Sequence, residues 1–273
     1  MSESAAPSVL VEKRPDGVAL ITLNRPESLN AMGGDLLPRL IEALADCATD
    51  RAVRCVALTG AGRGFCAGGD VKGMAARSGG GSGRPSTVDG GAYALAQSVL
   101  GTSGLLHSMP KPTVALINGA AAGGGLSLAL ACDVRIASEQ AVLTTAFAKV
   151  GLSGDYGMTY FLPRIVGHAV ARRLLFSAER VRAAEALALG LVARVVPPDA
   201  LLAEGLAYCA ELASGPTAAL GRMKANLLTG ETGTFAETVT REATHLVVSF
   251  QDHDHKEAAR AFVEKREPRF EGY

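Results

Sequence analysis

The stretch PTVALINGAAAGGGLSLALACD, residues 112–133, places the tightest constraint on how this chain can fold. Its apolar, β-branched run at 113–117 predicts a buried strand, and Asn-Gly at 118–119 predicts the turn that ends the strand. Three small residues follow, and then three glycines at 123–125 open an apolar segment of helical character. We therefore expect a strand, a tight turn and a helix that begins with bare backbone.

The three glycines allow two interpretations. The first N–H groups of a helix have no partner inside it, and together with the helix dipole they can hold a developing negative charge. A glycine-rich turn can equally serve close packing. Taken alone, residues 112–133 leave both interpretations open.

A second stretch has the same organisation. Residues 53–58 form another buried-strand run, which leads into TGAGRGFCAGGD at 59–70. There Gly68-Gly69-Asp70 introduces a polar turn and a possible helix. Because two backbone donors that converge on one oxygen form an oxyanion hole, the two stretches together favour a catalytic interpretation of the glycines.

The two stretches resemble those of the crotonase, or enoyl-CoA hydratase/isomerase, family. The resemblance extends over nearly the whole chain, from Asn-Arg-Pro at 24–26 to Phe270. It implies an α/β fold whose core, residues 1–198, is a spiral of ββα turns that carries the acyl-CoA site. It also implies a C-terminal helical region, residues 199–273, that forms a trimer, often paired into a hexamer. In such a fold the N–H groups of Gly69 and Gly124 would polarise a thioester carbonyl and hold the enolate.

The resemblance further implies which residues contact coenzyme A, which enters as part of the substrate rather than as a separate cofactor. The turn around Ser28-Leu29-Asn30 would lie along the CoA arm, and Phe262 and Lys265 would reach the CoA of a neighbouring subunit. The implied set is Ser28, Leu29, Ala67, Asp70, Val71, Phe262 and Lys265. Without the family, residues 28–29 are only a strand-to-helix connection, and residues 261–270 are the end of an amphipathic helix. No metal ion is expected.

The proton chemistry departs from that of the family's hydratases, which use two glutamates to position and activate water. The corresponding positions here are Ser127 and Phe147. A serine hydroxyl is a poor base near neutral pH, and phenylalanine cannot transfer a proton. Hydration by two carboxylates is therefore disfavoured, although a hydratase remains the alternative.

Asp155, in GLSGDYG, is the carboxylate left nearby. It could be an ordinary helix N-cap. Its position resembles that of the acid/base aspartate in the single-aspartate isomerases of the family, which act on epoxyphenylacetyl-CoA and on enoyl-CoA double bonds. We therefore expect an isomerase in which Asp155 moves a proton, with Ser127, Thr144 and Tyr156 as candidates to orient it. Partial desolvation would raise its pKa and make it a better base.

A catalytically silent CoA-thioester-binding protein is the other class of function. Such a protein would keep the fold but would need no carboxylate aimed at the acyl chain. Asp155 thus argues for an enzyme, although a capping role would leave the silent alternative open.

Composition sets the remaining limits. The 273 residues are 48% hydrophobic, enough for one domain, or one domain and a subdomain, with a sizeable core. Lys and Arg together number 27, as do Asp and Glu, so no basic excess predicts binding to nucleic acid or to a membrane surface. The five cysteines include no CxxC pair, and neither a signal sequence nor a lipid-length apolar run is found, which favours a reduced, cytoplasmic protein.

Periodicity predicts the other elements. Residues 8–11 and 18–23 indicate a hairpin, residues 34–49 and 93–107 indicate helices, and 134–137, 141–143 and 191–196 indicate short strands. Four helices are expected after residues 199, 216, 234 and 252. The glycine-rich segment 74–91 is expected to be a loop, either a linker or a lid over the pocket. Asp133 is expected to be structural, paired with an arginine at best.

Overall fold

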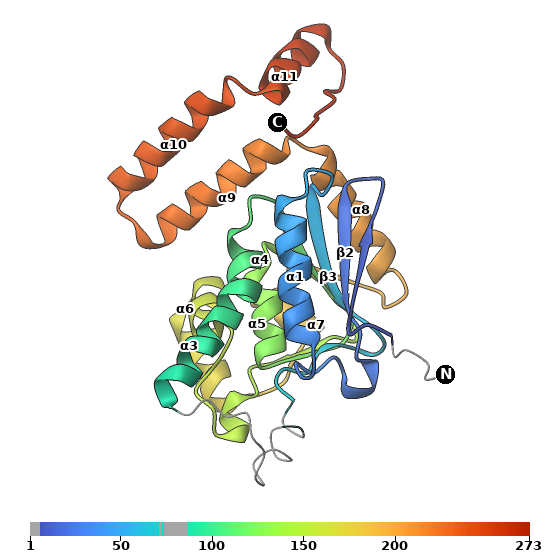
Figure 1. The fold of residues 1–273 in the computed structure, drawn as a ribbon, viewed down its shortest axis with the longest axis vertical. Helices are drawn as coiled ribbons and strands as arrows, with labels where there is room; N and C mark the ends of the chain where they lie inside the picture. Colours follow the sequence, from blue (N-terminus) through green and yellow to red (C-terminus); the bar gives the residue numbers. More distant parts are fainter. Residues whose placement is uncertain (1–5, 71–72, 74–86) are drawn as a thin grey trace.

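Two β-sheets form the centre of the computed structural model, which describes residues 6–70, 73 and 87–273 (Figure 1). The larger sheet has the order β1-β2-β3-β5-β7-β10, and the smaller one has the order β4-β6-β8-β9. In the larger sheet only the β1-β2 hairpin is antiparallel. Its strands are β1 (Val9–Lys13), β2 (Val18–Leu23), β3 (Cys55–Gly60), β5 (Thr113–Ile117), β7 (Val134–Ser138) and β10 (Arg194–Val196). Those of the smaller sheet are β4 (Gly64–Cys66), β6 (Ala120–Ala122), β8 (Val142–Thr144) and β9 (Val181–Arg182).

The chain passes between the two sheets in a regular way. Strands β3, β5 and β7 of the larger sheet are each followed, after a short turn, by β4, β6 and β8 of the smaller one. After β6 the chain enters α5 (Gly124–Ala131), whose eight residues are all buried. This is the ββα spiral that the family resemblance implies. It brings the turns after β4 and β6 to the same side of the molecule, because those two strands pair in parallel.

Helices cover both faces of the larger sheet because its strands are apolar on both sides. One face, with Ile21 and Leu58, packs against α1 (Leu36–Thr49) and α5. The other, with Leu20 and Leu116, packs against α8 (Leu201–Ser214). The other helices of the core are η1 (Pro26–Ser28), α3 (Val88–Val99), η2 (Leu100–Gly104), α4 (Leu105–Ser108), η3 (Phe147–Val150), α6 (Met158–Ser177) and α7 (Ala183–Ala188).

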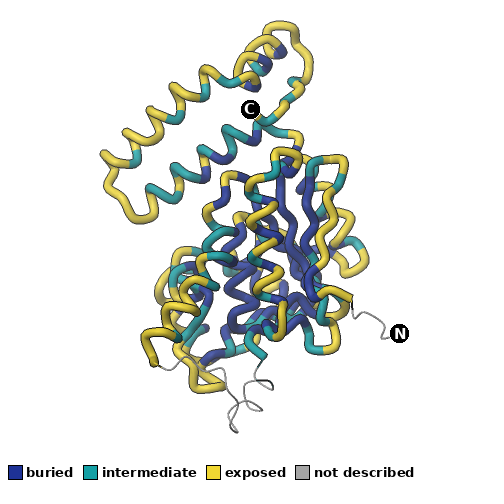
Figure 2. The backbone as a smooth tube through the Cα atoms, viewed as in Figure 1, coloured by how far each residue is buried: buried dark blue, intermediate teal, exposed yellow. Residues whose placement is uncertain are grey.

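The last three helices extend away from the sheets (Figure 1). They are α9 (Thr217–Thr232), α10 (Phe235–Ser249) and α11 (His253–Glu264), and α10 begins with a capping box between Thr234 and Glu237. No residue of α10 is buried, as its exposed colouring in Figure 2 shows. The predicted boundary between residues 198 and 199 stays a prediction; α8, which follows it, packs on the sheet.

Most of the elements expected from the sequence are found, but β4 and β9 were not expected, and the strand expected at 191–196 is shorter, as β10. The small residues at 120–122 were not expected to form a strand, but they are β6, because the parallel partners β4 and β8 complete their hydrogen bonding. The expected loop at 74–91 lies mainly outside the described residues. Its end, from Val88, is already helical because the Thr87 hydroxyl accepts a hydrogen bond from the Gly90 N–H and caps α3.

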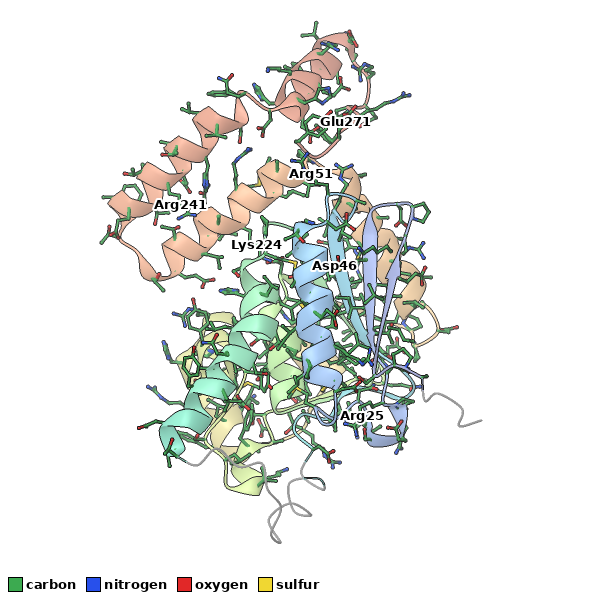
Figure 3. The ribbon with its side chains drawn as sticks, in the orientation of Figure 1. Arg25, Asp46, Arg51, Lys224, Arg241 and Glu271 are labelled. Atoms are coloured by element: carbon green, nitrogen blue, oxygen red, sulfur yellow. The ribbon has the colours of Figure 1, made fainter. Side chains whose placement is uncertain are left out.

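Lys224, on α9, joins the C-terminal helices to the core (Figure 3). Its buried ammonium group lies 2.8 Å from a carboxylate oxygen of Asp133 and donates to the carbonyl oxygens of Leu106 and Lys111. Asp133 also accepts from the N–H and hydroxyl of Thr113. The expectation of an arginine partner for Asp133 was wrong, because the lysine comes from a helix 91 residues further along the chain.

Replacing Lys224 by methionine is expected to lower the free energy of unfolding by roughly 2 to 3 kcal/mol. The apolar stem is kept, but two carbonyls and one carboxylate lose a buried donor. Denaturant unfolding measures the change. Arg39→Ala is the control, because Arg39 pairs with Asp35 at the surface and its loss should stay below about 1 kcal/mol. Equal losses in the two variants would contradict the role given to Lys224.

Candidate active site

The turn between β6 and α5 presents an open backbone donor. Gly123 has φ +51° and ψ −127°, a conformation that side-chain-bearing residues rarely adopt, and it directly precedes the first residue of α5. Gly124 is that first residue, so its N–H has no partner within the helix. Among the described residues, no protein atom accepts a hydrogen bond from this N–H.

The second glycine stretch lies directly beside the first. A Cβ atom built on Gly68 would stand 3.4 Å from the Gly124 nitrogen and 2.6 Å from the carbonyl oxygen of Ala122. On its other side the Gly68 carbonyl accepts a hydrogen bond from the Met32 N–H at 2.7 Å. Gly69, the next residue, is thereby held close to the start of α5. Within the described part of the chain its N–H donates to no protein atom, so two free donors lie in one region.

The turn after β2 is fastened to the same region. The buried Asn30 side chain donates to the carbonyl oxygens of Ala61 and Gly64, and the Ala67 N–H donates to the Leu29 carbonyl at 2.9 Å. Ser28 precedes Leu29 in this turn. The structure thus brings together Ser28, Leu29 and Ala67, three of the residues predicted to contact CoA.

Asp70 is held from two directions. Its carboxylate lies 3.8 Å from the Arg25 guanidinium and accepts a hydrogen bond from the Gly73 N–H at 2.9 Å. Arg25 also donates to the carbonyl of Ala31, next to Met32. Val71, the following residue of the predicted set, lies outside the described residues.

Asp155 lies against the first turn of α5. The hydroxyl of Ser127, on α5, donates to the Asp155 carbonyl oxygen at 2.9 Å, and the Tyr156 N–H donates to Asp155 Oδ1 at 2.7 Å. Burial raises the pKa of this half-buried carboxyl group, and the bond from Tyr156 opposes the shift. The residue that precedes α6 is Gly157, and no side chain caps this helix. The alternative that Asp155 is an N-cap was therefore wrong.

The positions that carry glutamate in hydratases of the family hold no carboxylate. Ser127 is fully buried, and its hydroxyl is within hydrogen-bonding distance of the Gly123 and Asp155 carbonyls. The ring of Phe147 is buried close to Gly123. Thr144, expected as a candidate to orient Asp155, instead donates its hydroxyl to the Ala178 carbonyl at 3.1 Å.

Phe262 and Lys265 are not part of this cluster in the single chain. They belong to the end of α11, which lies beyond α9 and away from the sheets (Figure 1). The Phe262 side chain is 86% exposed. Their predicted contact with CoA would therefore need a second subunit.

An open groove of about 1170 Å³ lies elsewhere, between α9 and α10. No residue of the predicted set lines it. The free backbone donors of Gly69 and Gly124 and the half-buried carboxylate of Asp155 lie instead around the start of α5. No three His, Cys, Asp or Glu side chains in the described chain are grouped to hold a metal ion.

Sequence reasoning missed two residues that shape the site. Met32 packs its methyl group directly on Gly124, where an added Cβ would clash with it. Asn30 belongs to the turn at 28–30 that was expected along the CoA arm, but its role in fastening this turn to β4, with φ +58°, was not expected. An Asn after a turn is a weak signal for such a conformation, and nothing in the sequence places a methionine beside a glycine 92 residues away.

Comparison with known proteins shows the family of this chain. The family model described as enoyl-CoA hydratase/isomerase matches residues 13–273. The chain is 35% identical to 1,2-epoxyphenylacetyl-CoA isomerase of Escherichia coli (strain K12), over 94% of this chain and 95% of that protein. It is 32% identical to the short-chain-enoyl-CoA hydratase of Clostridium acetobutylicum, over 97% of each. The crystal structure of enoyl-CoA hydratase from Bacillus anthracis superposes with a TM-score of 0.89 at 31% identity, covering 98% of this chain and all of that one.

The chain belongs to the enoyl-CoA hydratase/isomerase family, and its crotonase-like fold is confirmed. This family consists of enzymes that act on acyl-CoA. None of the helices in the described part of the chain combines the length and apolar character that a membrane span requires. All five cysteines are buried and free.

Proposed function

We propose that this protein is an acyl-CoA isomerase that shifts a double bond, or rearranges a ring, by moving one proton. The observation that carries the proposal is the half-buried carboxylate of Asp155 against the first turn of α5. In that turn the Gly124 N–H is free, and the two positions of the hydratase glutamates are Ser127 and Phe147. One carboxylate suffices for a proton shift, whereas water addition by the usual route uses two.

In the proposed reaction the thioester oxygen accepts hydrogen bonds from the N–H groups of Gly69 and Gly124. Asp155 removes a proton from a carbon conjugated with the thioester, and the electrons of the broken C–H bond become those of an enolate. The negative charge then rests on the oxygen between the two donors. Asp155 returns the proton to another carbon, so the product is an isomer and no water is consumed.

A hydratase is the second candidate, because several relatives are named hydratases. The Clostridium acetobutylicum relative is named a short-chain-enoyl-CoA hydratase, and a Rhodobacter capsulatus relative, 37% identical, is named a probable enoyl-CoA hydratase. In this role Asp155 alone would have to activate water, since the Ser127 hydroxyl is engaged with carbonyl oxygens.

Product analysis separates these functions. The protein is incubated with 3-enoyl-CoA, 2-enoyl-CoA and a ring-containing phenylacetyl-CoA derivative. The products are separated from unreacted substrate by liquid chromatography against standards of each isomer, and their masses are then measured by mass spectrometry. An isomer of unchanged mass supports the proposal, and a gain of one water from 2-enoyl-CoA supports a hydratase. Binding without turnover of any of the three would support a silent acyl-CoA-binding protein.

The pH dependence should report the state of Asp155. Because burial raises the pKa of this carboxyl group, the basic form is present only above that raised value. We expect kcat to fall as the pH is lowered through this raised pKa. The fall should therefore occur at a higher pH than it would for an exposed aspartate. Steady-state rates from pH 4 to 8 measure the profile. A rate that stays flat down to the ordinary range of aspartate would contradict a proton-transfer role.

We propose, in addition, that the C-terminal helices associate into a trimer, or a hexamer built from two trimers, as the family resemblance implies. What supports this is the apolar surface of α10, none of whose residues is buried in the single chain. Its exposed large apolar side chains are Phe235, Val239, Leu246, Val247 and Val248. Large apolar side chains left exposed along a whole helix favour an interface with another subunit.

Placing a charge on this surface should weaken the assembly. Leu246→Asp puts a carboxylate where the side chain is 57% exposed, and we expect sedimentation velocity to show a shift from trimer or hexamer toward monomer. Leu187→Asp on α7, in the core, where the residue is 45% exposed, is the matched control and should leave the assembly unchanged. A wild-type protein that sediments as a monomer would contradict the proposal.

A further inference from the structure

We propose that Tyr156 determines which acyl groups the site accepts, by closing the acyl pocket so that short chains are preferred. The inference rests on the proposed acyl-CoA site and adds the substrate class. The aromatic ring of Tyr156 lies directly on the residue whose N–H would hold the thioester oxygen. A Cβ atom built on Gly124 would stand 3.1 Å from Cδ2 of this ring.

The tyrosine also stands next to the proposed proton carrier. Its backbone N–H holds Asp155 Oδ1, and the Asp155 carbonyl is bonded to Ser127 one turn along α5 from Gly124. An acyl group whose carbonyl oxygen is at the Gly124 N–H must reach Asp155 for proton transfer. The chain beyond the reacting carbons therefore passes the ring of Tyr156.

The ring is held firmly in this place. Tyr156 is 4% exposed, and its hydroxyl lies 3.4 Å from the hydroxyl of Ser98 on α3. Its backbone has φ +51°, which is unusual for a large residue and fixes the direction of the side chain. Met32 packs on the same glycine, so the side chains of Met32 and Tyr156 together fill the space beside Gly124.

A tyrosine with left-handed backbone at this position favours a role in lining the acyl pocket over a role in core packing alone. A tyrosine kept only for the core would be expected in an unstrained conformation. Here a bulky ring is kept at a left-handed position between an oxyanion donor and a carboxylate. This combination is what a wall of a substrate pocket requires, and it limits acyl length through ring size rather than through the hydroxyl group.

The test compares kcat/KM for 3-enoyl-CoA substrates of four and ten carbons in the wild type, Tyr156→Gly and Tyr156→Phe. Glycine accepts φ +51° without strain and removes the ring. We expect it to raise the ten-carbon to four-carbon ratio by at least about tenfold. Phenylalanine keeps the ring, so the ratio should stay within about threefold of wild type.

Ligand binding gives a second readout, which does not depend on turnover. The rise in melting temperature with butyryl-CoA and with decanoyl-CoA is measured for each variant, and for Tyr156→Asn if the glycine variant is unfolded, since Asn also tolerates left-handed backbone. Only the variants without the ring should gain stabilisation from decanoyl-CoA relative to butyryl-CoA. An unchanged preference in a folded, ring-free variant would overturn the inference while leaving the proposed function intact. A wild type that neither binds nor converts any acyl-CoA would overturn both.

Discussion

Asp155→Asn is expected to lower kcat by about 100-fold to 10,000-fold, the usual effect of losing a general acid/base group. The change should leave the fold intact. An asparagine side-chain oxygen can still accept the hydrogen bond from Tyr156, and the bond from Ser127 goes to the backbone carbonyl, which is unaltered. What is lost is only the ability to take up and release a proton.

Isotope exchange sharpens this test. In heavy water the wild type should introduce deuterium at the carbon that gains the proton, unless Asp155 returns the same proton before solvent exchanges with it. The asparagine variant should neither isomerise nor exchange, and its melting temperature should stay close to that of the wild type.

Ser127→Ala is the matched control, because Ser127 touches the same residue through the backbone. Its hydroxyl cannot act as a base near pH 7, so we expect a change in kcat of about tenfold or less. Some stability should be lost, since a buried hydroxyl bonded to carbonyl oxygens contributes about 1 kcal/mol. Loss of activity in Ser127→Ala, or a kcat close to that of the wild type in Asp155→Asn, would show that Asp155 is not the proton carrier.

Gly124→Pro is expected to lower kcat by about 100-fold to 1000-fold relative to Gly124→Ala, the size of effect that follows loss of one oxyanion donor. Gly124 is the first residue of α5, where proline is well tolerated because no hydrogen bond within the helix is lost. Proline removes the N–H, whereas alanine keeps it.

The comparison with alanine separates the donor from the added bulk. Both substitutions introduce a Cβ atom that must displace the methyl group of Met32, the flexible end of its side chain, and that stands 3.1 Å from the Tyr156 ring. Steric loss should therefore appear in both variants, and the difference in kcat between them reports the N–H itself. KM should differ less than kcat, because the charge on the oxygen develops only as the proton leaves. Melting curves check that both proteins are folded, and equal rates in the two variants would remove Gly124 from the oxyanion hole.

The sequence by itself determined much of this protein. Apolar runs bounded by glycine and proline located the strands of the larger sheet, and the starts of the four C-terminal helices were predicted within a few residues. These features are local, because hydrophobic periodicity and the Gly and Pro residues that end helices or strands act over a few neighbouring positions. The two glycine motifs identified the family, which the comparisons confirm. The absence of glutamate at Ser127 and Phe147 was also readable from the sequence.

Only the tertiary structure decided how these pieces meet. Residues 120–122 became a strand because partners from elsewhere in the chain complete their hydrogen bonds. Asp133 took Lys224 as its partner because α9 crosses that point of the core. Gly68, Gly124 and Asp155 lie in one small region because parallel pairing of β4 and β6 aligns the turns that follow them, and because Ser127 ties α5 to Asp155. Contacts of this kind depend on positions far apart in the chain, so neither propensity nor periodicity carries information about them.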